Sequence, residues 1–459
     1  MSAARKILLL LATMSLATPS PAAQAEPPSV SEEDVSFPAA DITLQGTVFA
    51  PPADGQRHPA MVLVPGAGPE PSRTQIRSFM APLTRAGIVA LVPHRRTVGY
   101  SVTERSYTQL ADDTLAAVQV LRARADVDPG RVGLWGASEG AWVTPLAAAR
   151  SSEISFLVLI SASGVPPAQQ TAWELTNTLR RDGVSGSMAE HLPVKGVRLV
   201  AGLGQFPEAD YDTVPALERV RQPVLAVWGA QDHTVPPAES MSIVRNALDR
   251  AGNRDYALKV FPGVGHALSR AGDDFENATQ VVPEFFDMVD NWVNSHPAGV
   301  SVDPPPPEDR ASVPVTSDNW YESTWSQAMW LVLFVAAFAG YLGVAGWRKL
   351  RHRSTRPPVR WPARVLAVTG LLVPLALLGY VVTVLLTRSA GGVVAGFAVP
   401  FLAIRVLAVV ALVAAVALAV TWWRRRTEVL GGERVRLGLL LAGGLALVPW
   451  TVYWGLLAL

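Results

Sequence analysis

The composition of the chain changes abruptly near residue 320, and this change constrains the fold more than any other feature. Four apolar stretches follow it, residues 328–347, 365–386, 406–423 and 437–459, and each is about long enough to cross a bilayer as a helix. Tryptophans cluster near their ends, as in the aromatic belt of a membrane protein: Trp325, Trp330, Trp347, Trp361, Trp422 and Trp423. We therefore expect residues 327–459 to form an all-α transmembrane domain of four helices.

Charge predicts how these helices are oriented. From Gln327 onward the chain carries 14 Lys and Arg against 2 Asp and Glu, whereas the residues before it carry 25 against 36. The connections at residues 348–364 and 424–436 hold seven and five basic residues, and residues 387–392 hold one. The positive-inside rule places the first two connections in the cytoplasm and everything before the first span outside it.

Arg405 directly precedes the third apolar stretch, and we expect the span to begin after it, since residues 406–423 are nearly long enough alone. We expect its side chain to reach the outer interface, because no span supplies an acidic partner. An intramembrane site is the alternative interpretation.

The N-terminus predicts the same topology independently. Arg5 and Lys6 precede a short apolar run at residues 7–18, and the small-x-small sequence at 23–25 is typical of a cleavage site. Residues 1–25 are thus expected to be a signal peptide, with an uncleaved anchor as the alternative. The predicted location is the plasma (inner) membrane, spanned several times, with the domain that follows the signal outside the cytoplasm.

Residues 36–297 alternate short β-branched runs with helical stretches, which predicts an α/β fold with a mostly parallel sheet. Residues 41–51 alternate like an antiparallel edge strand, and continuous apolar runs such as residues 60–66 and 223–229 are typical of buried parallel strands. Residues 166–222 are longer than one crossover helix needs, and we expect a lid-like helical insert there. The Pro-rich residues 298–326 are expected to form an extended linker.

Several function classes are excluded or disfavoured by composition. The chain has no cysteine, which excludes disulfides, thiolate zinc sites and a cysteine nucleophile. It has no P-loop, dinucleotide fingerprint or His-Glu-x-x-His motif, and its basic residues follow the membrane connections. We expect no cofactor, no metal and no nucleic-acid partner.

One serine stands between two glycines in Gly136-Ala-Ser138-Glu-Gly140. Alone this pattern arises often by chance, but here it follows the strand-like residues 131–135 and opens a helical stretch. Such a tight turn needs small neighbours and directs the N–H groups of the helix N-terminus at the serine. We predict that Ser138 is a nucleophile.

A serine nucleophile needs a histidine base that is oriented by a carboxylate. In strand–turn–helix enzymes the order along the chain is serine, acid, histidine, each after a later strand. Asp232 and His266 meet that order, and His233 is the closest rival base. For the oxyanion, the predicted donors are the backbone N–H groups of Glu139 and of Ala67 in the glycine-rich loop after an early strand.

Residues 36–297 resemble the α/β-hydrolase superfamily, nearest its dienelactone-hydrolase and serine-aminopeptidase-like branches, through "VPGAG", "HRRTVGYS", "GLWGASEGAW", "GAQDHTVP" and "PGVGHAL". The resemblance implies Ser138 as nucleophile, Asp232 as orienting acid and His266 as base. It also implies that Arg95 or Arg96 supports the oxyanion side, although Thr97 replaces a glycine of the family's loop. The four spans have no counterpart in ordinary members.

The implied function is a membrane-anchored serine hydrolase outside the cytoplasm that cleaves a small-molecule, acyl or peptidyl substrate. An ester is favoured over an amide, since no acidic pair indicates an amine-binding site. The alternatives are an acyltransferase to a cell-envelope acceptor and a non-catalytic sensor or transport component that uses the fold as a binding module. The sequence leaves open the substrate, the oligomeric state and the role of the spans.

Overall fold

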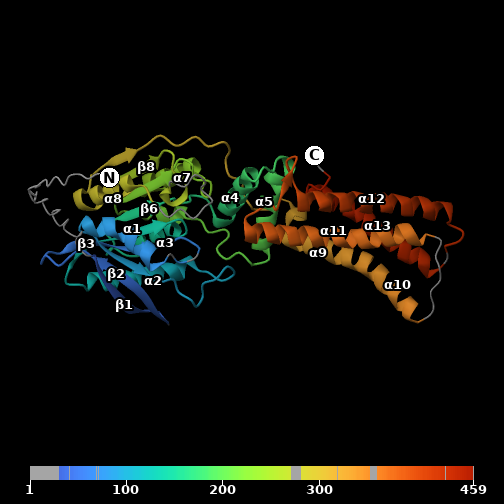
Figure 1. The fold of residues 1–459 in the computed structure, drawn as a ribbon, viewed down its shortest axis with the longest axis horizontal. Coiled ribbons are helices and arrows are strands. Elements are labelled where there is room, and N and C mark those ends of the chain that lie inside the picture. The colour runs from blue at the N-terminus through green and yellow to red at the C-terminus, as the bar shows by residue number, and fades with distance from the viewer. Residues whose placement is uncertain are drawn as a thin grey trace, which may run out of the picture.

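The computed structural model describes residues 30–40, 42–68, 70, 72–269, 281–317, 319–351, 359–429 and 431–457. The expected signal peptide lies outside these residues. The described chain forms an α/β domain and a bundle of long helices, with a pair of helices between them (Figure 1). The predicted combination of a mostly parallel sheet and four apolar helices is confirmed.

The α/β domain is built on a nine-stranded sheet with the order β1-β2-β4-β3-β5-β6-β7-β8-β9. Pairing is antiparallel between β1 and β2 and between β2 and β4, and parallel elsewhere. The strands are β1 (Ser31–Ala39), β2 (Ile42–Ala50), β3 (His58–Val64), β4 (Val89–Pro93), β5 (Val127–Ala137), β6 (Leu157–Ile160), β7 (Val224–Gly229), β8 (Tyr256–Phe261) and β9 (Val300–Val302). The apolar runs at β6 and β7 are buried throughout, as parallel strands covered on both faces should be.

The sheet extends beyond both predicted ends of the α/β region. It begins with β1 at Ser31, outside β2, so β2 is not the edge strand that its alternation indicates. It ends with β9, within the predicted linker. The acidic sequence of β1 does not indicate a strand. In the structure its charges are neutralised, because Glu32 and Asp34 form ion pairs with Arg73.

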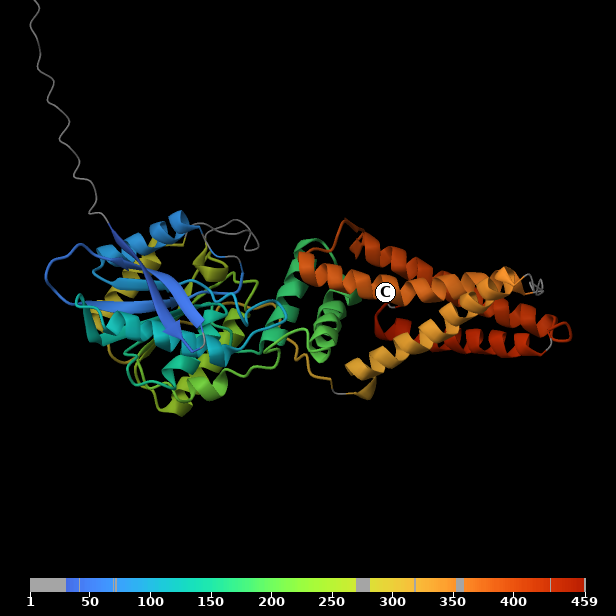
Figure 2. The same ribbon diagram turned by 90° about the horizontal axis from the view of Figure 1, so that it is seen from below.

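Helices cover both faces of the sheet (Figures 1 and 2). On one face α2 (Tyr107–Arg122), α3 (Gly140–Ala148) and α7 (Pro237–Ala251) contribute to one apolar core. On the other, α1 (Arg73–Arg85) and α8 (Pro283–Ser295) contribute to a second core with the opposite side chains of the same strands. This three-layer packing fixes the carboxyl ends of the parallel strands, where functional loops are usually found.

The bundle contains four helices long and apolar enough to cross a membrane: Thr324–Leu350, α11 (Arg360–Thr387), α12 (Val399–Arg424) and α13 (Gly432–Tyr453). The first comprises α9 (Thr324–Phe334), a π-helical turn (Val335–Ala339) and α10 (Gly340–Leu350). Arg405 lies inside α12, where its guanidinium donates to the Leu456 carbonyl oxygen at 3.1 Å and lies over the Phe397 ring. The helix therefore begins before Arg405 and not after it. The guanidinium charge of Arg405 is directed to the end of the bundle where Leu456 lies.

The two ends of the bundle differ in their neighbours (Figures 1 and 2). The connection between α11 and α12, and the C-terminal end of α13, lie toward the α/β domain. The end of α10 and the connection between α12 and α13, with its run Arg424, Arg425 and Arg426, lie at the far end. The described basic residues of these two connections are therefore remote from the α/β domain.

The predicted insert joins the two parts. Its helices α4 (Pro167–Arg181) and α5 (Gly186–Gly202) leave the sheet after β6 and return to β7 through a short helix α6 (Val214–Leu217), and they lie between the α/β domain and the bundle (Figure 2). They share one apolar core with the membrane helices, with members that include Leu175, Leu179, Met188, Leu192, Val381 and Val384. Two hydrogen bonds add to this core: Ser185 N–H to the Gly396 oxygen, and Ala390 N–H to Asp182 Oδ2, each at 2.9 Å. The insert is thus anchored to the bundle.

Candidate active site

Ser138 occupies the sharp turn between β5 and α3. Its φ is +52°, a left-handed conformation that is strained for a residue with a side chain. The flanking glycines are required by close backbone approaches, since a Cβ at Gly136 would lie 2.5 Å from the Gly140 oxygen and one at Gly140 would lie 2.1 Å from the Val64 oxygen. The turn therefore holds the Ser138 side chain out from the sheet at the N-terminus of α3.

Asp232 and His266 are brought together from the loops after β7 and β8. His266 Nδ1 lies 2.9 Å from Asp232 Oδ2, and the Asp232 side chain is fully buried. The backbone N–H groups of Thr234 and Val235 donate to Asp232 Oδ1 at 2.9 and 2.8 Å, which compensates the buried carboxylate. An Nδ1–H donated to Asp232 leaves Nε2 as the basic nitrogen of the imidazole.

The rival base His233 contacts the insert through its backbone. Its backbone oxygen accepts a hydrogen bond from the Asn177 amide of α4 at 2.9 Å. Asn177 in turn accepts from Arg310 Nη2 at 2.5 Å, and the same nitrogen donates to the Trp173 oxygen at 3.0 Å. Arg310 belongs to the predicted linker, so this segment fixes the insert against the Asp232 turn.

The end of β6 and the loop after it form hydrogen bonds with both the Ser138 turn and the residue after His266. Ser138 N–H donates to the Ile160 oxygen at 2.9 Å, and the next residue, Ser161, accepts the N–H of Ala267 on its hydroxyl at 3.1 Å. Ser161 itself has φ +47° and is fully buried. Sequence reasoning missed Ser161, because a serine after a strand carries no signal of its own.

The predicted oxyanion donors belong to two segments that adjoin Ser138. Glu139 follows it directly, and the loop with Ala67 passes over it, since a Cβ at Gly66 would lie 3.1 Å from Ser138 Cβ and 3.7 Å from Ser138 Oγ. This loop is held by the Arg95 guanidinium, which donates to the carbonyl oxygens of Gly66 and Gly68. Of the two arginines left open by the sequence, Arg95 supports the loop and Arg96 forms a buried ion pair with Asp113 at 3.2 Å.

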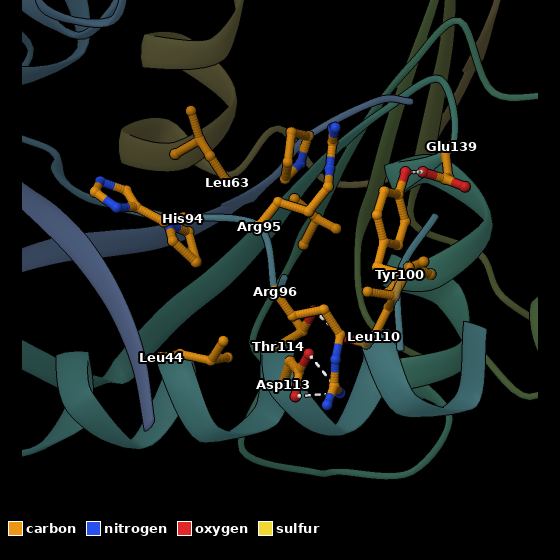
Figure 3. Close-up of a pocket in the computed structure, with 14 residues that line it drawn as sticks. Leu44, Leu63, His94, Arg95, Arg96, Tyr100, Leu110, Asp113, Thr114 and Glu139 are labelled. Carbon is orange, nitrogen blue, oxygen red and sulfur yellow. Dashed lines mark hydrogen bonds and ion pairs between the residues drawn. The ribbon is translucent and has the colours of Figure 1, made fainter. Parts of the chain in front are cut away.

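The Glu139 side chain is buried and points toward Tyr100 (Figure 3). Its carboxylate accepts the Tyr100 hydroxyl at 2.5 Å and pairs with Arg105 at 2.6 Å. Burial and the Glu139 charge raise the pKa of Tyr100 to about 12, so this hydroxyl stays a donor. A cavity of about 50 Å³ lies beside these groups and has room for water.

A further charged residue near the triad comes from the insert. Glu174 of α4 forms an ion pair at 3.2 Å with Arg388, which follows α11 in the bundle. Burial raises the pKa of the Glu174 carboxyl, the charges of Arg388 and His266 oppose that shift, and the charge of Asp232 adds to it. Asn177, three residues further along α4, donates to the His233 oxygen, so α4 links this ion pair to the turn that carries Asp232. No local sequence pattern signals a pair between residues so far apart.

Comparisons with known proteins agree on a hydrolase. The model of the prolyl oligopeptidase family matches residues 76–291. A thiohydrolase, apmlB, of Arthrinium phaeospermum is 30% identical over 139 residues, which are 29% of this chain and 44% of the relative. The acylamino-acid-releasing enzyme of Rattus norvegicus is 26% identical over 278 residues, 55% of this chain and 35% of the relative. The chain thus spans less than half the length of either curated relative.

Solved structures resemble this chain at low identity. A putative dienelactone hydrolase from Klebsiella pneumoniae has a TM-score of 0.39 at 17% identity and covers 57% of this chain and 95% of its own. An acylaminoacyl peptidase from Pyrococcus horikoshii has a TM-score of 0.42 at 16% identity and covers 57% of this chain and 41% of its own. The strand order and the family match together carry the assignment. The described residues thus have an α/β-hydrolase fold, with a match to the prolyl oligopeptidase family over residues 76–291, followed by four long apolar helices.

Proposed function

We propose that the protein is a membrane-anchored serine hydrolase that uses Ser138, His266 and Asp232. The observation that carries this proposal is the hydrogen bond between His266 Nδ1 and the buried Asp232 carboxylate, on the loops that follow the strained Ser138 turn in the required order. A structural serine in a turn needs neither the positive φ nor a paired imidazole three strands away.

The proposed reaction has two half-reactions. Ser138 Oγ attacks an acyl carbonyl carbon while His266 Nε2 takes its proton, and the N–H groups of Ala67 and Glu139 hold the oxyanion. The bond to the leaving group breaks as His266 returns the proton to it, which leaves an acyl-Ser138 ester. Water then attacks this ester with His266 as base, and the acid is released.

An ester is our first candidate substrate. A peptide or aminoacyl amide is the second, and two observations favour it: the match to the prolyl oligopeptidase family and the acidic Glu174 near the triad. The relatives named a thiohydrolase and an acylamino-acid-releasing enzyme suggest that thioesters and acylated amino acids belong in the same test. An acyltransferase would use the same triad with another acceptor in place of water.

We further propose that the hydrolase domain lies outside the cytoplasm at the plasma membrane. The position of the basic connections at the far end of the bundle supports this, because such connections stay in the cytoplasm. Cysteines introduced at Ser101 and Thr427 test it, since the native chain has none. Labelling of intact cells by an impermeant maleimide is expected at Ser101→Cys only, and labelling at Thr427→Cys only would reverse the orientation.

The activity is tested with purified wild type and Ser138→Ala on matched ester, thioester and aminoacyl-amide substrates. We expect the wild type to hydrolyse at least one class and Ser138→Ala to lose that activity. The class with the highest kcat/KM identifies the substrate type, and a wild type inactive on all three would contradict the proposal.

A further inference from the structure

A groove runs along the membrane bundle between α11 and α12. It has a volume of about 700 Å³ and is lined by Ala376, Tyr380 and Thr383 of α11 and by Pro400, Ala403 and Leu407 of α12. Thr383, Pro400 and Ala403 are exposed, so the groove opens on the outer surface of the bundle. In a membrane this surface would face lipid.

The groove matches one leaflet in depth. The segment of α11 that lines it, from Ala376 to Thr387, rises about 16 Å at 1.5 Å per residue. Half of a hydrocarbon core of roughly 30 Å is about 15 Å. At the end of the groove far from the α/β domain the lining is apolar, with Ala376 and Leu407. At the end nearest the insert, which we call the upper end, Thr387 and Ser389 bring hydroxyl groups to the lining. This polarity suits an apolar chain that ends in a polar group.

The upper end of the groove adjoins the hydrolase domain. Ser389, Ala390 and Gly391 line that end, and Ala390 N–H donates to Asp182 of the insert. The preceding residue, Arg388, pairs with Glu174 at 3.2 Å. Glu174 lies on α4, and Asn177 of the same helix donates to the His233 backbone oxygen, beside Asp232, at 2.9 Å, so one helix links this end of the groove to the candidate active site.

We propose that this groove binds the long apolar chain of a membrane-resident substrate whose scissile carbonyl reaches Ser138. This inference rests on the proposed hydrolase function and adds the substrate class, an amphipathic ester or amide with one extended hydrocarbon chain. A chain fits better than a second protein helix, because the groove lies between adjacent helices at single-leaflet depth and ends at a site for acyl chemistry. The bundle then serves as part of the substrate site as well as an anchor.

The test blocks the groove without touching the triad. Ala403→Trp fills it from α12, and Ala376→Phe fills it from α11. Val409→Trp is the matched control, since Val409 is exposed on α12 but does not line the groove. Each full-length variant is placed in lipid nanodiscs and assayed on two pairs of esters: 4-nitrophenyl acetate with 4-nitrophenyl palmitate, and ethyl acetate with hexadecyl acetate.

We expect the wild type to prefer the long-chain member of at least one pair. Both groove variants should lower kcat/KM for that member by about tenfold or more and leave the short-chain member within about twofold, whereas Val409→Trp should change neither. Equal losses for short and long chains in both groove variants would overturn the inference, as would no preference for the long chain in either pair. A short-chain activity that survives Ser138→Ala would contradict the proposed function instead.

Discussion

The carboxylate of Glu174, on the insert of the hydrolase domain, lies 3.2 Å from the guanidinium of Arg388, on the connection between two membrane helices. The two residues are 214 positions apart, and their pair joins the apolar core shared by the insert and the bundle to the vicinity of the triad. The membrane bundle therefore contacts the insert of the hydrolase domain through a defined ion pair.

The first prediction concerns the energetic coupling of this pair. Arg388→Gln should lower the free energy of unfolding by about 1 kcal/mol, since Arg388 is partly exposed and its interaction is screened by solvent. In a Glu174→Gln background the same change should cost markedly less, because no carboxylate is left unpaired. Denaturation of the wild type, the two single variants and the double variant in one detergent measures the coupling energy. Arg180→Gln, which removes an exposed pair between α4 and Glu190 of α5, is the control and should show no coupling to Glu174.

The second prediction is the pH dependence of Glu174→Gln. The folded state raises the pKa of Glu174 above its ordinary 4.5, so the folded protein binds more protons than the unfolded one in that range. The contribution of Glu174 to the free energy of unfolding is therefore fully present below pH 4.5 and is lost as the pH rises through the raised pKa. Glutamine mimics the protonated form, so the melting temperature of Glu174→Gln relative to wild type should rise from pH 4.5 upward. A difference that is constant with pH would contradict this.

The third prediction concerns Ser161, which accepts the Ala267 N–H beside His266. Ser161→Ala removes a buried hydrogen bond of about 1 kcal/mol and should lower kcat about fivefold with little change in KM, because the base is displaced while the binding surface is kept. Ser155→Ala is the matched control. Its hydroxyl donates to the Val132 oxygen at 2.9 Å beside the opposite end of β6, so kcat should not change. Equal losses in both variants would indicate a general loss of stability.

The fourth prediction concerns Arg95, which holds the loop over Ser138. Arg95→Gln should lower kcat by about tenfold, less than the hundredfold or more that follows direct loss of an oxyanion donor. Labelling of Ser138 by a fluorescent phosphonate should slow in proportion, since that reagent needs the same oxyanion contacts. Arg57→Gln, at an exposed residue, is the control. Normal labelling of Arg95→Gln would show that the loop keeps its position without this contact.

Local sequence patterns predicted the parts of the molecule that depend on local physics. The buried strands, the four apolar helices and the glycine-flanked turn at Ser138 follow from runs of apolar or small residues. The acidic strand β1 was missed because its charges are neutralised by Arg73 and Arg77 of a distant helix. The contact between Glu174 and Arg388 was missed for the same reason, since a pair so far apart in the chain depends on how two separately folded parts pack.

The lid-like insert shows most clearly what local sequence patterns cannot predict. Its length and its place after a strand predicted helices near the site, and α4 and α5 are there. Its apolar residues, such as Leu175 and Met188, are consistent with either a mobile cover or a fixed one. Only the shared core with α11 decides between them, because burial against the bundle keeps the cover in place.

The most direct test of the account is to label the purified protein with a fluorescent phosphonate and map the modified residue by mass spectrometry. Wild type should be modified at Ser138, Ser138→Ala should not be labelled, and Asp232→Asn should label at least about a hundredfold more slowly, because the imidazole loses the partner that sets its tautomer. Hydrolysis of the preferred substrate should fall in the same order. Modification at another serine, or full hydrolysis by Ser138→Ala, would contradict the account.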